Sequence, residues 1–361
     1  MASLQSIGAF APYSARGVPQ TEAARLLARK QTRMDIALAT LLSPIVLFFL
    51  LGLGAALLKS QMTIPEAFAK GLAIYLMMSI GLKGGVAISE GDLGWDAGFV
   101  MISAVALSFL LPAIAYGLLR LTTRLGAIDA AATAAHYGSI SIVTFVAAGQ
   151  AIAAAGLETS GYLVAVAALM EVPAIISALI IAHRSPGNRE SIAGSDRGEL
   201  AREVMLNASV VVLIGSLIIG WISGEQGMKA IAPFFVEPFQ GVLCLFLLDM
   251  GLSAGRGLRN GWRQLGPGTI AFGIYMPLVS SLLAAGVAAL NGMGTGDAAL
   301  LITLAASASY IAVPAAMRLA LPKARPSIYL TLSLGITFPF NLILGLPLYI
   351  WLARAIAPGA A

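Results

Sequence analysis

The chain has little charge, one cysteine and two histidines. Of its 361 residues only 11% are Asp, Glu, Lys or Arg, whereas about a quarter are charged in ordinary soluble domains. The single cysteine, Cys244, excludes an intrachain disulfide, and the two histidines lack the paired spacing of a zinc or haem site. No run of Lys or Arg is interleaved with aromatic residues, so the net charge of +5 does not indicate nucleic-acid binding. An ordinary soluble domain is therefore excluded.

Apolar side chains make up 58% of the chain and fall in ten long stretches. A membrane-spanning helix needs about 20 apolar residues, so ten spans and their connections use nearly the whole chain. The sequence therefore predicts an all-α integral membrane protein without a sizeable soluble domain. The ten predicted spans are residues 36–58, 64–82, 97–119, 130–155, 161–182, 204–222, 230–252, 268–290, 298–321 and 327–353.

Basic residues are concentrated in the odd-numbered loops between these spans. Beyond residue 33, thirteen Lys and Arg lie in odd loops, and three, Lys83, Lys229 and Arg354, lie on the other side. Because cytoplasmic loops carry an excess of Lys and Arg, the polar linker 184–203 is predicted to be cytoplasmic. Both termini are then expected outside the plasma (inner) membrane.

The first 33 residues oppose this orientation, because their five basic residues would lie on the outer side. One hypothesis is that residues 1–33 are an extension and that translation starts at Met34, immediately before the first span. The alternative is a short basic surface helix over residues 23–33.

The two halves of the chain, residues 34–183 and 204–354, resemble each other. Each half holds five predicted spans, and an odd number of spans gives the second copy the opposite orientation in the membrane. Chance similarity between Ala-, Gly- and Leu-rich stretches is the alternative, but four pairings in the same order favour two inverted five-helix repeats. The pairings are residues 76–85 with 246–255, Pro65 with Pro238, Asp129 with Asp297, and Pro173 with Pro339.

The fourth and ninth predicted spans contain small polar residues at equivalent places. Two serines two positions apart point to different sides of an ideal helix, so both reach one ligand only where the backbone is extended. Pro314 removes a helix hydrogen bond in the ninth span and Gly138 permits a break in the fourth. We therefore predict discontinuous fourth and ninth helices, with helix packing by Ser, Gly and Ala as the alternative. The equivalent serines are Ser139 with Ser307 and Ser141 with Ser309.

Two half-helices whose N-termini meet near the bilayer midplane would offer free N–H groups and positive dipole ends to a small anion. Hydroxyl groups would complete the shell of that anion. The predicted substrate contacts are Ser139, Ser141, Thr144, Ser307 and Ser309.

Charges at membrane depth are costly and usually functional. Glu171 lies within the fifth predicted span, and its repeat equivalent is Thr337. Together with Thr337 and Asn341, Glu171 is predicted either to bind a coupling Na⁺ through oxygen ligands or to carry a proton. His136 is expected to be a packed or interface residue. For Asp249 a functional role and a structural one, in which it neutralises a neighbouring Arg or Lys, both stay open. No chemistry is assigned to four residues close to span ends: Lys83, Asp129, Glu237 and Arg318.

These features resemble the sodium-dependent bicarbonate transporter family, the SbtA type first known from cyanobacteria, over residues 36–353. The motifs are Ile64-Pro-Glu-Ala67, Ile80-Gly-Leu-x-Gly-Gly85, Asp129-Ala-x-Ala-Thr133, Glu171-Val-Pro-Ala174, Ala305-Ala-Ser307 and Pro326-Ser-x-Tyr329. The resemblance implies ten transmembrane helices in a core and a gate domain, homotrimers, Na⁺-coupled bicarbonate uptake, and no cofactor beyond the coupling ion. A PII-like regulator binds some members, but the short linker of this chain offers such a regulator little surface to bind.

Two runs depart from the family pattern. Ser141-Ile-Val-Thr144 and Ser307-Ala-Ser-Tyr310 have fewer oxygen atoms than the cyanobacterial runs, and Tyr310 stands in place of an acidic residue. Tyr310 is therefore a further candidate substrate contact, either filling the space of the carboxylate or stacking on a larger substrate. The sequence predicts a secondary-active transporter of a small anion, bicarbonate first. The alternatives are an organic-anion or monocarboxylate symporter, an intramembrane Ser–His enzyme using His136, and a passive channel.

Overall fold

The computed structural model describes residues 42–90, 95–184, 208–261, 264–310, 313–314, 317, 321 and 323–357. The predicted extension 1–33, the start at Met34 and most of the linker 184–203 lie outside these residues. Every regular element in the described part is a helix. Seven helices are long and apolar enough to cross a membrane, and three shorter helices are also apolar.

The first half of the chain forms seven described helices. They are α2 (Pro44–Leu57), α3 (Glu66–Glu90), α4 (Trp95–Thr122), α5 (Ala127–His136), α6 (Ile142–Ala154), α7 (Leu163–Leu169) and α8 (Glu171–Arg184). The second half forms the remaining described elements. Its elements are α11 (Ala208–Phe235), α12 (Phe239–Gly261), α13 (Pro267–Leu290), α14 (Thr295–Ala306), α16 (Pro326–Leu332), η2 (Ser333–Thr337), α17 (Phe338–Phe340), η3 (Asn341–Gly345) and α18 (Leu346–Ile356).

Each predicted span overlaps a described helix or helix pair, but two boundaries were wrong. The second predicted span ended at residue 82, whereas α3 continues to Glu90, so Lys83 lies inside a helix. The seventh was predicted to start at residue 230, whereas α11 kinks at Gly224 (φ 56°, ψ −161°) and continues to Phe235. The kink falls at Gly224 because only glycine adopts that positive φ readily. A hydropathy window averages over many residues and so does not detect a kink at one of them.

Four helices form one layer of the molecule, in which α2 packs along α12 and α3 packs along α11. Glycines allow their backbones to touch: a Cβ on Gly85 would lie 2.1 Å from Leu217 O, and one on Gly251 would lie 2.1 Å from Phe49 O. Small residues permit this close approach between membrane helices. Each pair joins one helix from each half of the chain, so we call α2, α3, α11 and α12 the gate layer.

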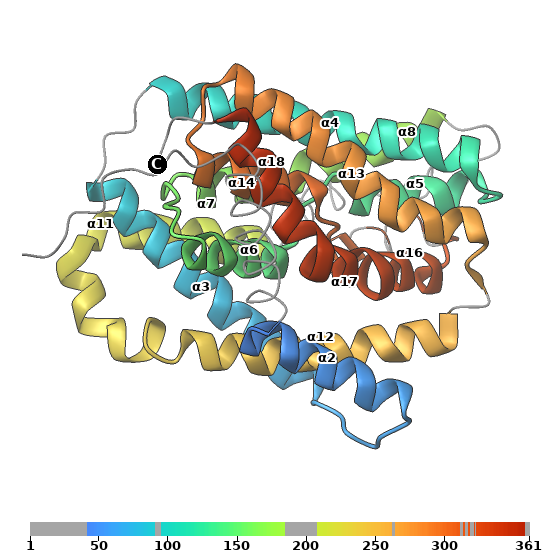
Figure 1. Cartoon of the computed structure of the whole chain (residues 1–361), viewed down its shortest axis with the longest axis horizontal. Helices are drawn as coiled ribbons and strands as arrows, with labels where there is room; N and C mark the ends of the chain where they lie inside the picture. Colours follow the sequence, from blue (N-terminus) through green and yellow to red (C-terminus); the bar gives the residue numbers. More distant parts are fainter. Residues whose placement is uncertain are drawn as a thin grey trace, which may run out of the picture.

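The remaining helices form a second layer, the core layer, around α4 and α13, which contact each other. Helices α5 and α8 pack on α4, α14 packs on α13, and α6 and α18 pack on α14. Figure 1 shows α4 and α8 along the upper edge of the molecule and α2 and α12 along the lower edge. The two layers meet where α12 touches η2 and α16, and where α3 and α11 touch α7.

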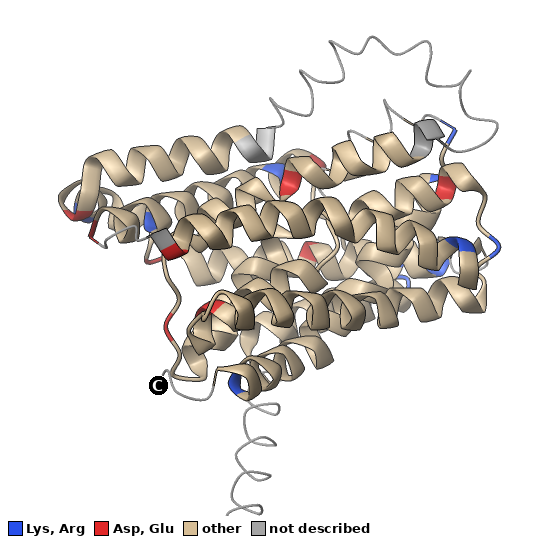
Figure 2. Cartoon of the chain, turned by 90° about the horizontal axis from the view of Figure 1, so that it is seen from above, with Lys and Arg blue, Asp and Glu red and all other residues tan. Residues whose placement is uncertain are grey.

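Charged residues lie mostly near the ends of the helices, with blue gathering toward the right of Figure 2 and most of the red toward the left. One end, the basic end, carries the last turns of α2, α4 and α12 and the starts of α5 and α16; Arg259 Nη1 there donates to Ala56 O (3.1 Å). Its basic residues are Lys59, Arg120, Arg124, Arg256, Arg259, Lys323 and Arg325. The opposite, acidic end carries Glu90, Asp96, Glu158, Glu225 and Asp297.

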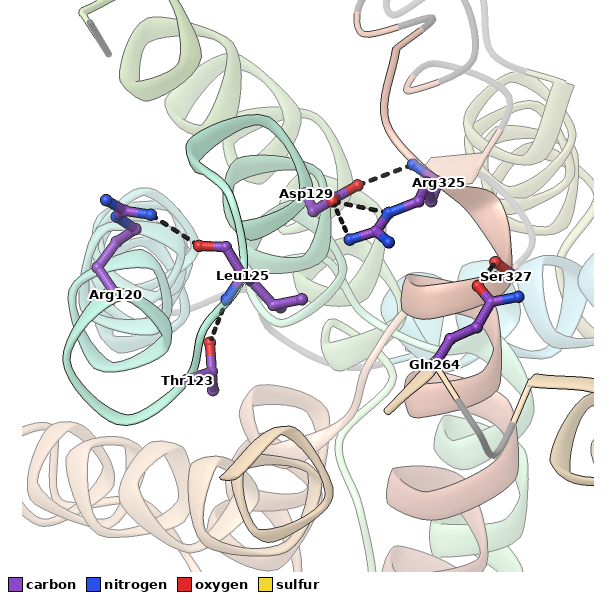
Figure 3. Close-up of polar contacts among 7 residues, drawn as sticks. All are labelled: Arg120, Thr123, Leu125, Asp129, Gln264, Arg325 and Ser327. Carbon is purple, nitrogen blue, oxygen red and sulfur yellow. Dashed lines mark hydrogen bonds and ion pairs between the residues drawn. The ribbon is translucent and has the colours of Figure 1, made fainter. Parts of the chain in front are cut away.

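An aspartate clamps the chain at each end. At the basic end Asp129 Oδ1 accepts a hydrogen bond from Arg325 N (2.9 Å), and Oδ2 accepts from Arg325 Nε (3.0 Å) and Nη2 (2.7 Å), as Figure 3 shows. At the acidic end Asp297 accepts from Ser160 N and from Ser160 Oγ, both at 2.7 Å. Both aspartates lie in the first turn of a helix, where the helix dipole favours a negative charge.

We expect Asp129→Ala to lower the free energy of unfolding by about 1–3 kcal/mol, because the carboxylate, whose side chain is 12% exposed, holds a backbone N–H as well as the guanidinium. Arg325 itself is 56% exposed, so the ion pair alone contributes little. Glu225→Ala, which breaks the exposed pair with Lys229, is the matched control and should cost less than about 0.5 kcal/mol. Chemical denaturation of the purified proteins measures both, and equal losses would contradict the assignment.

Candidate functional site

The chain leaves helical geometry in the middle of the fourth predicted span, as the sequence suggested. Helix α5 ends at His136, α6 begins at Ile142, and Ser141 caps α6 by accepting a hydrogen bond from Thr144 N (3.2 Å). Gly138 lies against the ring of Pro112, where an added Cβ would be 2.3 Å from Pro112 Cγ. The first break is therefore built on a glycine that no other residue can replace without displacing the break.

A second break follows α14, which ends at Ala306. Residues 307–310 are non-helical, and the next described residues, 313–314, are helical again. Ser307 donates to Leu304 O through both its hydroxyl (2.7 Å) and its backbone N–H (3.1 Å), which closes the end of α14.

The two breaks are hydrogen-bonded to each other deep inside the core layer. Ser141 N donates to Ser307 Oγ (2.9 Å), and Ser309 N donates to His136 O (2.8 Å). The ring of His136 is hydrogen-bonded through Nδ1 to Ser309 O and stacks on Tyr329 at 4.7 Å between centroids. Segments 173 residues apart thus form one crossing, held by hydrogen bonds between the two breaks.

A small pocket lies beside this crossing. Its shape leaves room for about one water-sized group. Glu171 is 2% exposed, and its Oε2 has no hydrogen-bond partner among the described residues. The pocket is lined by Met77, Ile140, Ser141, Ile142, Glu171, Ser309 and Tyr310.

The start of α6 supplies hydrogen-bond donors to the pocket. The first amides of a helix have no acceptor within that helix, and Ser141 satisfies only Thr144 N. Ile142, the first residue of α6, lines the pocket, so the positive end of the helix dipole is directed there. The pocket therefore combines N–H and hydroxyl donors with one carboxyl group, an arrangement suited to an anion and to a cation that neutralises Glu171.

The structure brings three of the predicted substrate contacts, Ser141, Ser309 and Tyr310, to the pocket. Ser139 is buried and its hydroxyl has no described partner, but it does not line the pocket. Ser307 uses its hydroxyl within the crossing, and Thr144 is buried with its backbone amide bound to Ser141.

The predicted cation ligands are not brought together. Thr337 Oγ1 is bonded to the hydroxyl of Tyr137 (2.6 Å) and donates to Gly273 O (2.7 Å). Asn341 donates to Ala306 O (2.8 Å) and accepts from the hydroxyl of Tyr349 (2.7 Å). Neither residue lines the pocket of Glu171. Residues equivalent by an internal repeat occupy equivalent, not adjacent, positions, so the pairing of Glu171 with Thr337 in sequence did not imply contact.

Two further residues hold the site together. Ser108 Oγ lies 3.1 Å from Gly138 O and 2.6 Å from Met170 O, so it ties the first break to the residue before Glu171. Tyr137 joins the same break to Thr337. A single serine in the apolar third span carries no sequence signal for this role, whereas Tyr137 beside Gly138 was visible as part of the break.

The enzyme alternative has no support in the described geometry. No described serine hydroxyl bonds to His136, whose Nδ1 is bound to a carbonyl group and whose Nε2 has no described partner. A nucleophilic serine needs a base within hydrogen-bond reach. Among the described residues no three His, Cys, Asp or Glu side chains gather as a metal site.

Comparison with known families agrees with the resemblance seen in the motifs. The sequence model of the Na⁺-dependent bicarbonate transporter superfamily matches residues 44–354, which include both breaks and Glu171. No curated protein matches the chain. Since the match covers most of the chain, this multi-pass membrane protein belongs to the Na⁺-dependent bicarbonate transporter superfamily.

Proposed function

We propose that the protein is a secondary-active transporter that takes up bicarbonate with Na⁺ by alternating access, using ten transmembrane segments in two inverted five-helix repeats. The family match supports the substrate class and the coupling ion. The observation that carries the mechanism is the hydrogen-bonded crossing of the two breaks, with the N-terminus of α6 and the hydroxyls of Ser141 and Ser309 at one pocket. Broken helices at a repeat interface are where such transporters bind substrate.

Two sets of contacts support the inverted repeat. The clamp of Asp129 on Arg325 at the basic end is matched by the clamp of Asp297 on Ser160 at the acidic end. In the gate layer the first helix of each half packs on the second helix of the other half. Both patterns follow from a two-fold axis in the membrane plane. With the basic end at the cytoplasm, as the positive-inside rule requires, the linker 184–203 is cytoplasmic and both termini are outside.

The two layers support a movement of the core layer against the gate layer. Both breaks, Glu171 and the clamps belong to the core layer, and Met77 of α3 in the gate layer closes one side of the pocket. Because the pocket has room for about one water-sized group, binding of the larger bicarbonate ion requires this side to open. Glu171 binds the coupling cation beside Ser141, Ser309 and Tyr310.

We expect the double substitution Ser141→Ala and Ser309→Ala to abolish uptake without loss of expression, because it removes both serine hydroxyls of the pocket. The lost cap on α6 costs only about 1 kcal/mol of stability. The matched control is Ser89→Ala with Ser223→Ala, two exposed serines bonded to carbonyls of their own helices. Labelled bicarbonate uptake into reconstituted vesicles measures both, and unaltered uptake by the pocket variant would rule out this site.

The coupling ion is tested with the unmodified protein in the same vesicles. Uptake of labelled bicarbonate should rise when a Na⁺ gradient is directed inward and fall to the background of empty vesicles without it. Uptake that is equally fast without Na⁺ contradicts the coupling, and no uptake under either condition contradicts the substrate. We further expect homotrimers, which the mass of the detergent-solubilised protein tests.

A second candidate substrate is an organic monocarboxylate. The apolar side chains of Met77, Ile140 and Ile142 and the ring of Tyr310 line the pocket, and they suit a substrate that carries carbon groups beside its carboxylate. Inhibition of bicarbonate uptake by pyruvate or acetate, with direct uptake of the labelled acid, distinguishes this candidate. Tyr310→Asp should then favour bicarbonate.

A further inference from the structure

Lys83 is a charged residue inside a membrane-spanning helix. Helix α3 continues for seven residues beyond it, to Glu90. Lys83 is therefore not a residue at the end of its helix. The side chain is half-buried. A lysine in such a position is costly unless it faces the protein interior or a water-filled path, and it is usually functional.

No carboxylate of the described residues lies within ion-pair distance of Lys83. The three described ion pairs belong to Lys70, Lys229 and Arg325. Instead, Lys83 Nζ lies over the ring of Phe239, 4.5 Å from its centroid. The face of a phenyl ring attracts a cation only weakly at a partly exposed site, so the positive charge stays available to an anion.

The surroundings place Lys83 where the gate layer meets the core layer. On α3, Gly84 packs against Val164 of the core layer, where an added Cβ would lie 2.5 Å from Val164 Cγ2. Phe239 begins α12, and the next residue, Gln240, donates to Gln150 Oε1 of α6 (2.9 Å). The ammonium group is thus near the junction of α3, α12 and α6.

The same helix reaches the pocket. Met77 lines the pocket and precedes Lys83 by six residues, which is about 9 Å along a helix axis. Lys83 therefore lies between the pocket and the acidic end. An anion that enters from the acidic end passes the carboxylates of that end, and Lys83 is a half-buried cation on the boundary along which the two layers would move.

We propose that Lys83 binds the transported anion on its way between the acidic end and the pocket, and so determines that the protein accepts anions. The inference rests on the transport function proposed above. Lys83 is a second, peripheral binding residue for a small monoanion, separate from the serines of the crossing.

A matching cation at the other end supports this role. In the internal repeat, Lys83 is equivalent to Ser253 of α12, and Arg256 Nη2 donates to Ser253 Oγ (3.2 Å). The guanidinium group of Arg256, on the side of the pocket that faces the basic end, therefore reaches the position equivalent to Lys83. Alternating access exposes the pocket to each end in turn, and each route then has one cation at the same depth.

The test measures uptake of labelled bicarbonate by reconstituted Lys83→Met and Lys83→Arg. We expect Lys83→Met to raise KM about tenfold with a smaller change in the maximal rate, since one charge interaction at a partly exposed site is lost. Lys83→Arg should keep KM within about threefold, because the charge remains. Lys70→Met, on the exposed face of the same helix, is the control and should match the unmodified protein. An unchanged KM in Lys83→Met overturns the proposal.

A charge-rescue experiment separates loss of charge from loss of structure. Lys83→Cys in a Cys244→Ser background has one thiol, because Cys244 is the single cysteine of the chain. Modification with a thiosulfonate that adds an ethylammonium group should restore uptake, and one that adds an ethylsulfonate should not. Equal effects of both reagents overturn the role of the charge. If the unmodified protein takes up no bicarbonate, the proposed transport function is contradicted. This outcome differs from one in which the unmodified protein transports bicarbonate but the charge at position 83 has no effect.

Discussion

Gly138→Ala should abolish uptake and lower the temperature of unfolding. An alanine Cβ at this position would lie 2.3 Å from Pro112 Cγ and 3.0 Å from Ala174 Cβ. A proline ring inside α4 cannot turn away, so the first break itself must move. Forcing an extra carbon into a packed interior costs about 1–3 kcal/mol of stability. The larger effect is on transport, because the displaced segment carries Ser141 and its hydrogen bond to Ser307.

The control for this change is Gly149→Ala in α6 of the same predicted span. No atom lies within 4 Å of an added Cβ there, and alanine favours a helix by about 1 kcal/mol over glycine. Gly149→Ala should therefore keep normal uptake and equal or higher thermal stability. Thermal unfolding in detergent and vesicle uptake measure both variants. If Gly138→Ala transports normally, the geometry of the first break does not matter for transport.

Glu171→Gln should abolish uphill, cation-driven uptake while leaving the protein folded. An ionised carboxylate without a partner costs several kcal/mol when buried, and Glu171 Oε2 has no described partner. A neutral amide of the same shape removes that charge, so stability should not fall. It also removes the charge that a coupling cation must neutralise. Exchange of labelled for unlabelled bicarbonate, without any gradient, should persist and no longer respond to Na⁺.

Glu171→Asp is the control, because it keeps the carboxylate. It should retain cation-driven uptake at a reduced rate. Na⁺-driven accumulation by Glu171→Gln at the rate of the unmodified protein would remove Glu171 from the coupling mechanism. Thermal unfolding of both variants shows whether a loss of uptake has a structural cause.

The sequence predicted the class of fold and the places where helices break, because these are local properties. Twenty apolar residues are long enough to span a bilayer wherever they pack, and Gly138 weakens a helix whatever surrounds it. The boundaries at Glu90 and Gly224 were missed for the opposite reason. Neither the continuation of a polar helix end nor a kink at one glycine changes the average hydropathy of a segment.

Part of the candidate site could also be predicted. Ser141 and Ser309 were chosen because they lie at expected breaks, Glu171 because it is a charge within a predicted span, and Tyr310 because it replaces an acidic residue of the resembling family. All four line the pocket. Thr337 was grouped with Glu171 through the repeat alignment, yet it is bonded to Tyr137. An alignment of two halves identifies equivalent positions, and the distance between equivalents depends on how far they lie from the symmetry axis.

By itself the sequence determined that the chain is a multi-span helical membrane protein and that two spans are interrupted by small polar residues. Only the tertiary structure decided that the two interruptions hydrogen-bond to each other, that Ser108 ties the first of them to the start of α8, and that Lys83 lies against Phe239 without a described carboxylate. These contacts join residues far apart in the chain. They depend on how the two layers pack, and no local pattern of residues records that packing.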